Sequence, residues 1–118
     1  MLSVALSINA QQAPQHEYKP DGYKIITVET PKDVRFHVTG LDSDSAGVIW
    51  VATRFGEVWY LKQGQWSKFA EGLHEPTGLM VDDDGSILVA QKPELTRLID
   101  TNNDNKADAY IPVANDWE

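Results

Sequence analysis

The chain contains no cysteine, few basic side chains and no long hydrophobic run. Without cysteine there is no disulfide, thiolate metal site or c-type haem attachment within these 118 residues. Ten Lys and Arg face 18 Asp and Glu, which gives a net charge of −8. Because a surface of that sign repels phosphate groups, nucleic acid is disfavoured as a partner. No apolar stretch approaches the roughly 20 residues of a membrane-spanning helix, so we expect no transmembrane segment.

The first ten residues form a short apolar segment that ends in Ala10 and is followed by polar Gln11 and Gln12. This pattern is typical of the apolar region and cleavage end of a signal peptide, although a positively charged start is missing. We therefore expect residues 1–10 to be a signal-peptide remnant and the protein to be secreted or periplasmic. The alternative is an exposed apolar tail. Residues 11–22 are predicted to be a flexible lead-in.

An internal repeat is the strongest pattern in the sequence. Residues 39–53 align without a gap with residues 77–91, and eight of the fifteen positions are identical. Each copy carries an Asp-rich turn closed by Gly47 or Gly85, between segments rich in β-branched and apolar residues. A period near 40 residues made of short strands is typical of a β-propeller blade. The sequence therefore predicts an all-β fold that contains about two four-stranded antiparallel blades.

The predicted propeller part covers residues 23–118, with blades at about 36–71 and 74–113. A further strand is predicted at residues 23–29, where it would complete another blade. Because closed rings typically have four to eight blades, we expect a fragment of a larger propeller. The alternative is a two-sheet domain that assembles with copies of itself. The strands predicted within the two blades are residues 37–41, 48–52, 57–62, 66–70, 77–81, 86–90, 95–100 and 110–113.

One face of such a disc carries the loops between strands 2 and 3 and the loops between blades. Polar side chains at the mouth of a central channel are candidates for a ligand site. The alternative is that they are merely solvated loop residues. No residue can be assigned a catalytic role. The candidates on this face are Arg54, His74, Glu75, Gln91 and Lys92.

The opposite face carries an Asp- and Asn-rich loop. Asp100, Asn102, Asp104 and Asp108 place side-chain oxygens at loop positions 1, 3, 5 and 9, and Lys106 offers a backbone carbonyl at position 7. Alternate oxygen donors on a tight loop suit Ca²⁺. The loop is therefore predicted to bind Ca²⁺ in a structural role. The alternative is a polar turn whose side chains cap backbone amides.

Three tryptophans lie within predicted strands. Trp50, Trp59 and Trp66 stand at positions expected to pack between blades. A sugar-stacking platform is the alternative for one of them.

Two stretches and the loop carry a family resemblance. Residues 72–79 (GLHEPTGL), residues 87–101 (ILVAQKPELTRLIDT) and the Asn/Asp loop resemble the N-terminal blades of secreted bacterial propellers similar to PQQ-dependent sugar dehydrogenases. The resemblance implies oxidation of a sugar or alcohol with PQQ as cofactor, and in some relatives a following cytochrome c module. It implies that most PQQ-binding and catalytic residues lie in other blades.

Two other functions stay open. The stretch from Pro76 also resembles lactonase-like metal hydrolases, in which Glu75 would be a candidate ligand of a central Ca²⁺. The third possibility is a non-enzymatic propeller scaffold that binds a glycan or a protein.

Overall fold

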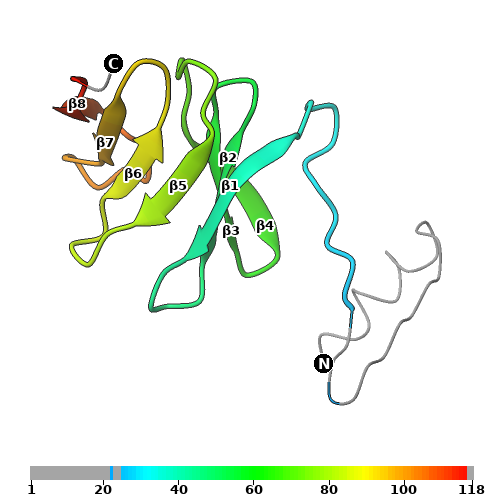
Figure 1. Ribbon diagram of the computed structural model, residues 1–118. Helices are drawn as coiled ribbons and strands as arrows, with labels where there is room; N and C mark the ends of the chain where they lie inside the picture. Colours follow the sequence, from blue (N-terminus) through cyan, green and yellow to red (C-terminus); the bar gives the residue numbers. More distant parts are fainter. Residues whose placement is uncertain (1–21, 23–24, 117–118) are drawn as a thin grey trace. The chain divides into compact units, whose positions relative to one another are not determined.

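The computed structural model describes residue 22 and residues 25–116, and in this part of the chain the fold is all-β. Eight strands form two four-stranded antiparallel sheets, each with its strands in sequence order (Figure 1). The predicted fold class is therefore confirmed. No helix in the described part is long and apolar enough to cross a membrane. The first sheet contains β1 (Val38–Ser43), β2 (Ile49–Thr53), β3 (Val58–Lys62) and β4 (Gln65–Ala70); the second contains β5 (Gly78–Val81), β6 (Ile87–Ala90), β7 (Leu95–Ile99) and β8 (Ala109–Ala114).

The repeat in the sequence is a repeat in the backbone. In the turn between β1 and β2, the Asp44 N–H donates to Val48 O and the Gly47 N–H donates to Asp44 O, each at 3.0 Å. The turn between β5 and β6 has the same two hydrogen bonds, each at 2.9 Å, at the positions 38 residues later. Both closing glycines have positive φ angles, 83° at Gly47 and 85° at Gly85, which other residues adopt only with strain.

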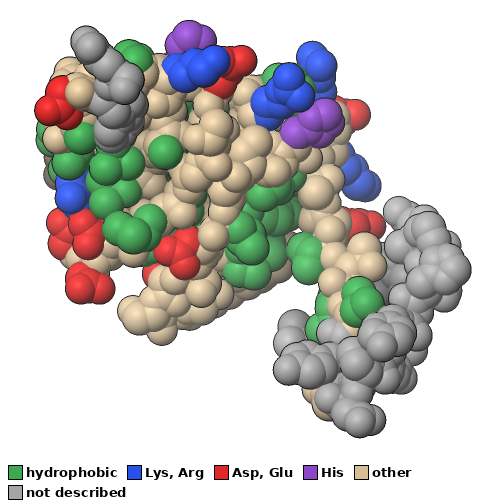
Figure 2. Space-filling model, in the orientation of Figure 1, with side chains coloured by type: hydrophobic (Ala, Val, Ile, Leu, Met, Phe, Trp, Pro, Cys, Tyr) green, Lys and Arg blue, Asp and Glu red, His purple; other side chains and the backbone are tan. Residues whose placement is uncertain are grey.

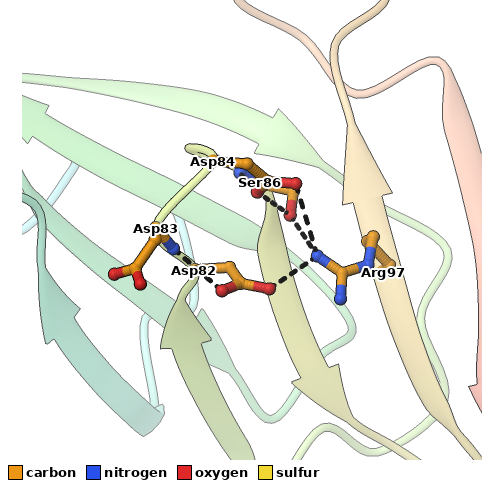
Figure 3. A network of polar contacts seen from close by, with 5 residues as sticks. All are labelled: Asp82, Asp83, Asp84, Ser86 and Arg97. Carbon is orange, nitrogen blue, oxygen red and sulfur yellow. Dashed lines mark hydrogen bonds and ion pairs between the residues drawn. The ribbon is translucent and has the colours of Figure 1, made fainter.

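An arginine braces the turn of the second sheet. Arg97 on β7 donates from Nη1 to Asp82 Oδ2 at 2.7 Å and to Ser86 Oγ at 2.6 Å (Figure 3). Ser86 in turn donates from Oγ and from its backbone N–H to Asp84 Oδ1. In the first sheet a tryptophan braces the turn, because Trp50 Nε1 donates to Asp44 Oδ2 at 3.1 Å.

The two sheets approach each other most closely at their first strands, β1 and β5. A Cβ atom added to Gly40 on β1 would lie 2.6 Å from the Leu79 N atom and 2.8 Å from the Gly78 carbonyl carbon. Only glycine therefore permits this approach. Two positions further along, Asp42 Oδ2 accepts a hydrogen bond from the Val81 N–H at 2.9 Å, so a side chain of one sheet bonds the backbone of the next.

The core lies between the facing surfaces of the two sheets. Trp50 and Tyr60, with ring centroids 5.0 Å apart, pack at its edge, and Trp50 meets Phe69 edge to face, also at 5.0 Å. Trp59 is nearly buried on the other face of the first sheet, where Phe36 packs against it and against Trp66. The buried core residues are Ala52, Val58, Phe69, Ala70, Leu73, Ile87, Val89 and Leu98.

The strand predicted at residues 23–29 is wrong for its described part, residues 25–29, which form no strand. Ile25 and Ile26 are about half exposed, at 56% and 50%. Apolar and β-branched composition alone therefore does not determine that a strand forms. The predicted signal-peptide remnant and most of the predicted lead-in lie outside the described residues.

Candidate functional site

The candidate site is the edge where the β4–β5 connection meets the β6–β7 loop. The Lys92 N–H donates to His74 O at 3.0 Å, and Gln91 Oε1 accepts a hydrogen bond from the His74 N–H at 2.6 Å. The β2–β3 loop reaches the same connection, because the Leu73 N–H donates to Gly56 O at 3.0 Å. Loops that the repeat predicted to share one face are thus joined by backbone hydrogen bonds.

Glu75 stands at the centre of this edge, which we call the rim and define by Arg54, His74, Glu75, Gln91 and Lys92. Glu75 Oε2 lies 3.1 Å from Lys92 Nζ. The hydrogen bond and charge of Lys92 hold the pKa of Glu75 below its ordinary value, and the nearby charges of His74 and Arg54 lower this pKa further. Glu75 is therefore a carboxylate at neutral pH, and the rim brings all five predicted ligand-face residues together.

The backbone of Glu75 also has an uncommon conformation, with φ at 45°. Positive φ costs free energy in residues other than glycine, and such residues are often found at functional sites. The Glu75 and Lys92 side chains are 54% and 72% exposed, so their ion pair contributes little to stability. An incoming ligand can consequently displace the pair at low cost.

A second group of side chains lies beside the rim, and sequence reasoning missed one of its members, Arg35. The Arg35 guanidinium carbon lies 4.3 Å from the centroid of the Phe55 ring, and the His37 ring packs on Phe55 at 5.2 Å. The Arg54 N–H donates to His37 O at 2.8 Å, which joins this group to the rim. Arg35 precedes the first repeat and has no equivalent in the second copy, so the alignment of the copies carried no signal for it.

Basic side chains are concentrated at one edge of the sheets. Figure 2 shows the visible His side chains and most of the visible Lys and Arg side chains along the upper edge, where some Asp and Glu side chains also lie, and further Asp and Glu at the lower left. The upper edge corresponds to the start of β5 in Figure 1, and the lower left to the turn between β5 and β6. The basic side chains of the rim therefore lie beside an acidic one, Glu75.

The Asp/Asn loop between β7 and β8 is ordered by its own side chains. Asp100 accepts hydrogen bonds from the N–H groups of Asp104, at 3.2 Å, and Asn105, at 2.8 Å. Asn102 Oδ1 accepts from the Asp104 N–H, and Asp104 Oδ1 from the Lys106 N–H. At the end of the loop Asp108 accepts from the Thr101 N–H and hydroxyl, and the resulting hydrogen bonds lower the pKa of Asp108.

The donor types in this loop suit a hard cation, but their arrangement is that of a capped turn. Within the ranges that the structure describes, no three His, Asp or Glu side chains are grouped so that they could hold a metal ion. Each carboxylate can accept further hydrogen bonds or bind a cation, because an ionised carboxylate has about four lone-pair positions. Ca²⁺ binding by the side chains of Asp100, Asn102, Asp104 and Asp108 and by the backbone carbonyl of Lys106 thus stays a prediction.

Comparison of the chain with protein-family models, with curated proteins and with solved structures found no match. The resemblance to PQQ-dependent sugar dehydrogenases accordingly stays a prediction.

Proposed function

We propose that this chain is part of a quinoprotein-type propeller that oxidises a sugar or an alcohol, and that its rim supplies one segment of the ligand-binding mouth. One observation carries the proposal: hydrogen bonds join the β4–β5 connection to the β6–β7 loop. His74 in the first segment bonds Gln91 and Lys92 in the second. These loops hold the Glu75 carboxylate, the Gln91 amide and the Lys92 ammonium, and the β2–β3 loop adds a second cation, Arg54, at the same edge. Such groups bind hydroxyl and carboxylate groups of small molecules.

The rim residues fit a carboxylated quinone such as PQQ in charge, because Arg54 and Lys92 both act on Glu75 and can instead pair with ligand carboxylates. Bound PQQ would supply the hydride acceptor. The residues of this chain would bind and orient the quinone or the sugar, and no base for the hydroxyl proton is assigned to them. A following cytochrome c module remains part of the proposal only through the family resemblance.

The lactonase-like alternative is less well supported by the geometry. In that alternative Glu75 would bind a central Ca²⁺, but Glu75 is paired with the Lys92 ammonium, which repels a cation. Glu75 would need to leave Lys92 before it could bind the metal.

The test is an NMR titration of the ¹⁵N-labelled full chain with glucose and, separately, with PQQ. We expect the amide signals of His74, Gln91 and Lys92 to shift with either ligand, and no reduction of an electron-acceptor dye by this chain alone with glucose and PQQ. Lys92→Ala should raise the dissociation constant for PQQ, obtained from the amide shifts, about tenfold, which is the loss expected for one charge-assisted contact. Lys106→Ala, which removes the same charge from the Asp/Asn loop, is the matched control. Shifts confined to residues outside the rim would refute the proposal.

A further inference from the structure

An open cleft of about 850 Å³ lies between the two sheets, lined by the β1–β2 and β5–β6 turns and by the β3–β4 and β7–β8 loops. The sheets approach each other most closely at β1 and β5, and the end of β4 is also hydrogen-bonded to the β7–β8 loop. The cleft lies at the edge opposite the rim, and none of its lining residues belongs to the rim.

Aromatic rings form one wall of the cleft. Trp50 and Tyr60 lie side by side with their planes inclined by 40°, and the half-buried Trp50 ring also contacts Phe69. The hydrogen bond from Trp50 Nε1 to Asp44 Oδ2 fixes the indole, so the platform is formed before any ligand arrives. Such a platform suits a molecule with an apolar face.

Polar side chains without partners surround this platform. Within the described residues, the side chains of Gln65 and Ser67 on β4 and of Asn103 and Asn105 in the Asp/Asn loop make no hydrogen bond, although all four line the cleft. An amide has both a donor and an acceptor, as does a hydroxyl, so these groups match the hydroxyls of a sugar. Asp44, Asp84 and Asp100 also line the cleft, against the one ammonium of Lys62, which disfavours an anionic ligand.

The two walls are held at a set distance by direct hydrogen bonds. The Ala107 N–H donates to Phe69 O at 2.7 Å, which ties the end of the Asp/Asn loop to β4. Tyr110 on β8 donates its hydroxyl to Glu71 O at 3.1 Å and accepts from the Glu71 N–H. A ligand therefore meets walls that are already in place, which reduces the entropy cost of binding.

We propose that this cleft binds a neutral carbohydrate, whose apolar ring face packs on Trp50 and Tyr60 while its hydroxyls bond Gln65, Ser67 and the Asn side chains. A volume of about 850 Å³ accommodates several sugar rings, so the ligand class is an oligosaccharide. This site is separate from the rim, and its existence does not depend on the proposed oxidation.

The experiment is calorimetric titration of the full chain with neutral gluco-oligosaccharides of six units, α-linked in one series and β-linked in another. Oligogalacturonate of the same length is the anionic comparison. We expect saturable binding of at least one neutral series and none of the anionic one. Absence of binding of both neutral series up to about 10 mM, where even weak sites would be occupied, would overturn the proposal. Preference for the anionic oligosaccharide would overturn it equally.

Variants locate the site. Gln65→Ala and Asn103→Gly should each weaken binding about fivefold, as expected for the loss of one hydrogen bond, and glycine accepts the φ of 61° at Asn103. Trp50→Leu should weaken it at least tenfold if its circular dichroism shows a folded chain, and the first two variants decide the matter if it does not. Lys92→Ala, at the rim, should leave oligosaccharide binding unchanged. Equal losses in the rim and cleft variants would contradict a separate site.

Discussion

We expect alanine substitutions at two equivalent glycines of the repeat, Gly40 and Gly78, to have different effects on stability. A Cβ at Gly40 would press into the backbone of β5, 2.6 Å from the Leu79 N atom, whereas a Cβ at Gly78 would lie 3.9 Å from the Ala90 Cβ, an ordinary contact. Neither glycine has a positive φ, so alanine causes no backbone strain at either position. The two substitutions therefore differ only in whether the added methyl group collides with the backbone of the neighbouring sheet.

Alanine in place of glycine restricts the unfolded chain and stabilises a protein by about 0.4–1 kcal/mol where the fold accepts it. Overpacking costs about 1–3 kcal/mol, and a rigid backbone neighbour places Gly40→Ala toward the upper end. We expect Gly40→Ala to lower the free energy of unfolding by about 1–2 kcal/mol and Gly78→Ala to leave it equal or slightly higher.

Urea denaturation of the two full-length variants, followed by tryptophan fluorescence, measures both changes in the free energy of unfolding. For a small domain the urea dependence is about 1–3 kcal/mol per molar, so Gly40→Ala should lower the midpoint by roughly 1 M. Equal midpoints for Gly40→Ala and the unsubstituted chain would refute the packing of β1 on β5. If a third sheet packs on β5 in a longer propeller, Gly78→Ala should become destabilising in that protein.

Two other predictions concern the acidic residues. The Val81 and Ser43 N–H groups hold the pKa of Asp42 below 3.8, so its contribution to stability is present above about pH 4 and is lost as pH falls through the lowered folded-state pKa. Asp42→Ala should accordingly reduce the fall of the urea midpoint between about pH 4 and pH 2, and an unchanged pH profile would contradict the contact with Val81. Calorimetry should detect Ca²⁺ binding that Asp100→Ala abolishes and Asp83→Ala preserves, with Mg²⁺ a poor substitute; no heat at millimolar Ca²⁺ would show that the Asp/Asn loop is only a turn.

The strands were predictable because local signals and the repeat agree. Asp44 and Gly47, and their equivalents in the second copy, predict both turns, and the apolar segments on either side predict the strands that the turns connect. Residues 25–29 have a similar apolar composition and yet form no strand, because composition alone does not decide strand formation.

The rim was predictable from topology alone, because loop order in a repeat determines which loops meet. Its finer chemistry was not predictable. Glu75 and Lys92 pair across two different loops, which no local pattern links. Arg97 fixes the β5–β6 turn, whereas the indole N–H of Trp50 fixes the turn of the first copy. The cleft depends on side chains from four separate turns and loops, which no local pattern links.

The third and fourth strands of each sheet are joined by connections of different length, and this difference has a consequence for protein engineering. Gln63 and Gly64 suffice to join β3 to β4, whereas nine residues join β7 to β8, yet strand pairing continues directly beside both, at Lys62 with Gln65 and at Ile99 with Ala109. By loop-closure entropy, lengthening a loop from two to nine residues costs only about 1.3 kcal/mol. The turn between β3 and β4 is therefore a suitable place to graft a foreign segment, because the second sheet has a nine-residue connection at the equivalent position and its strands pair up to the ends of that connection.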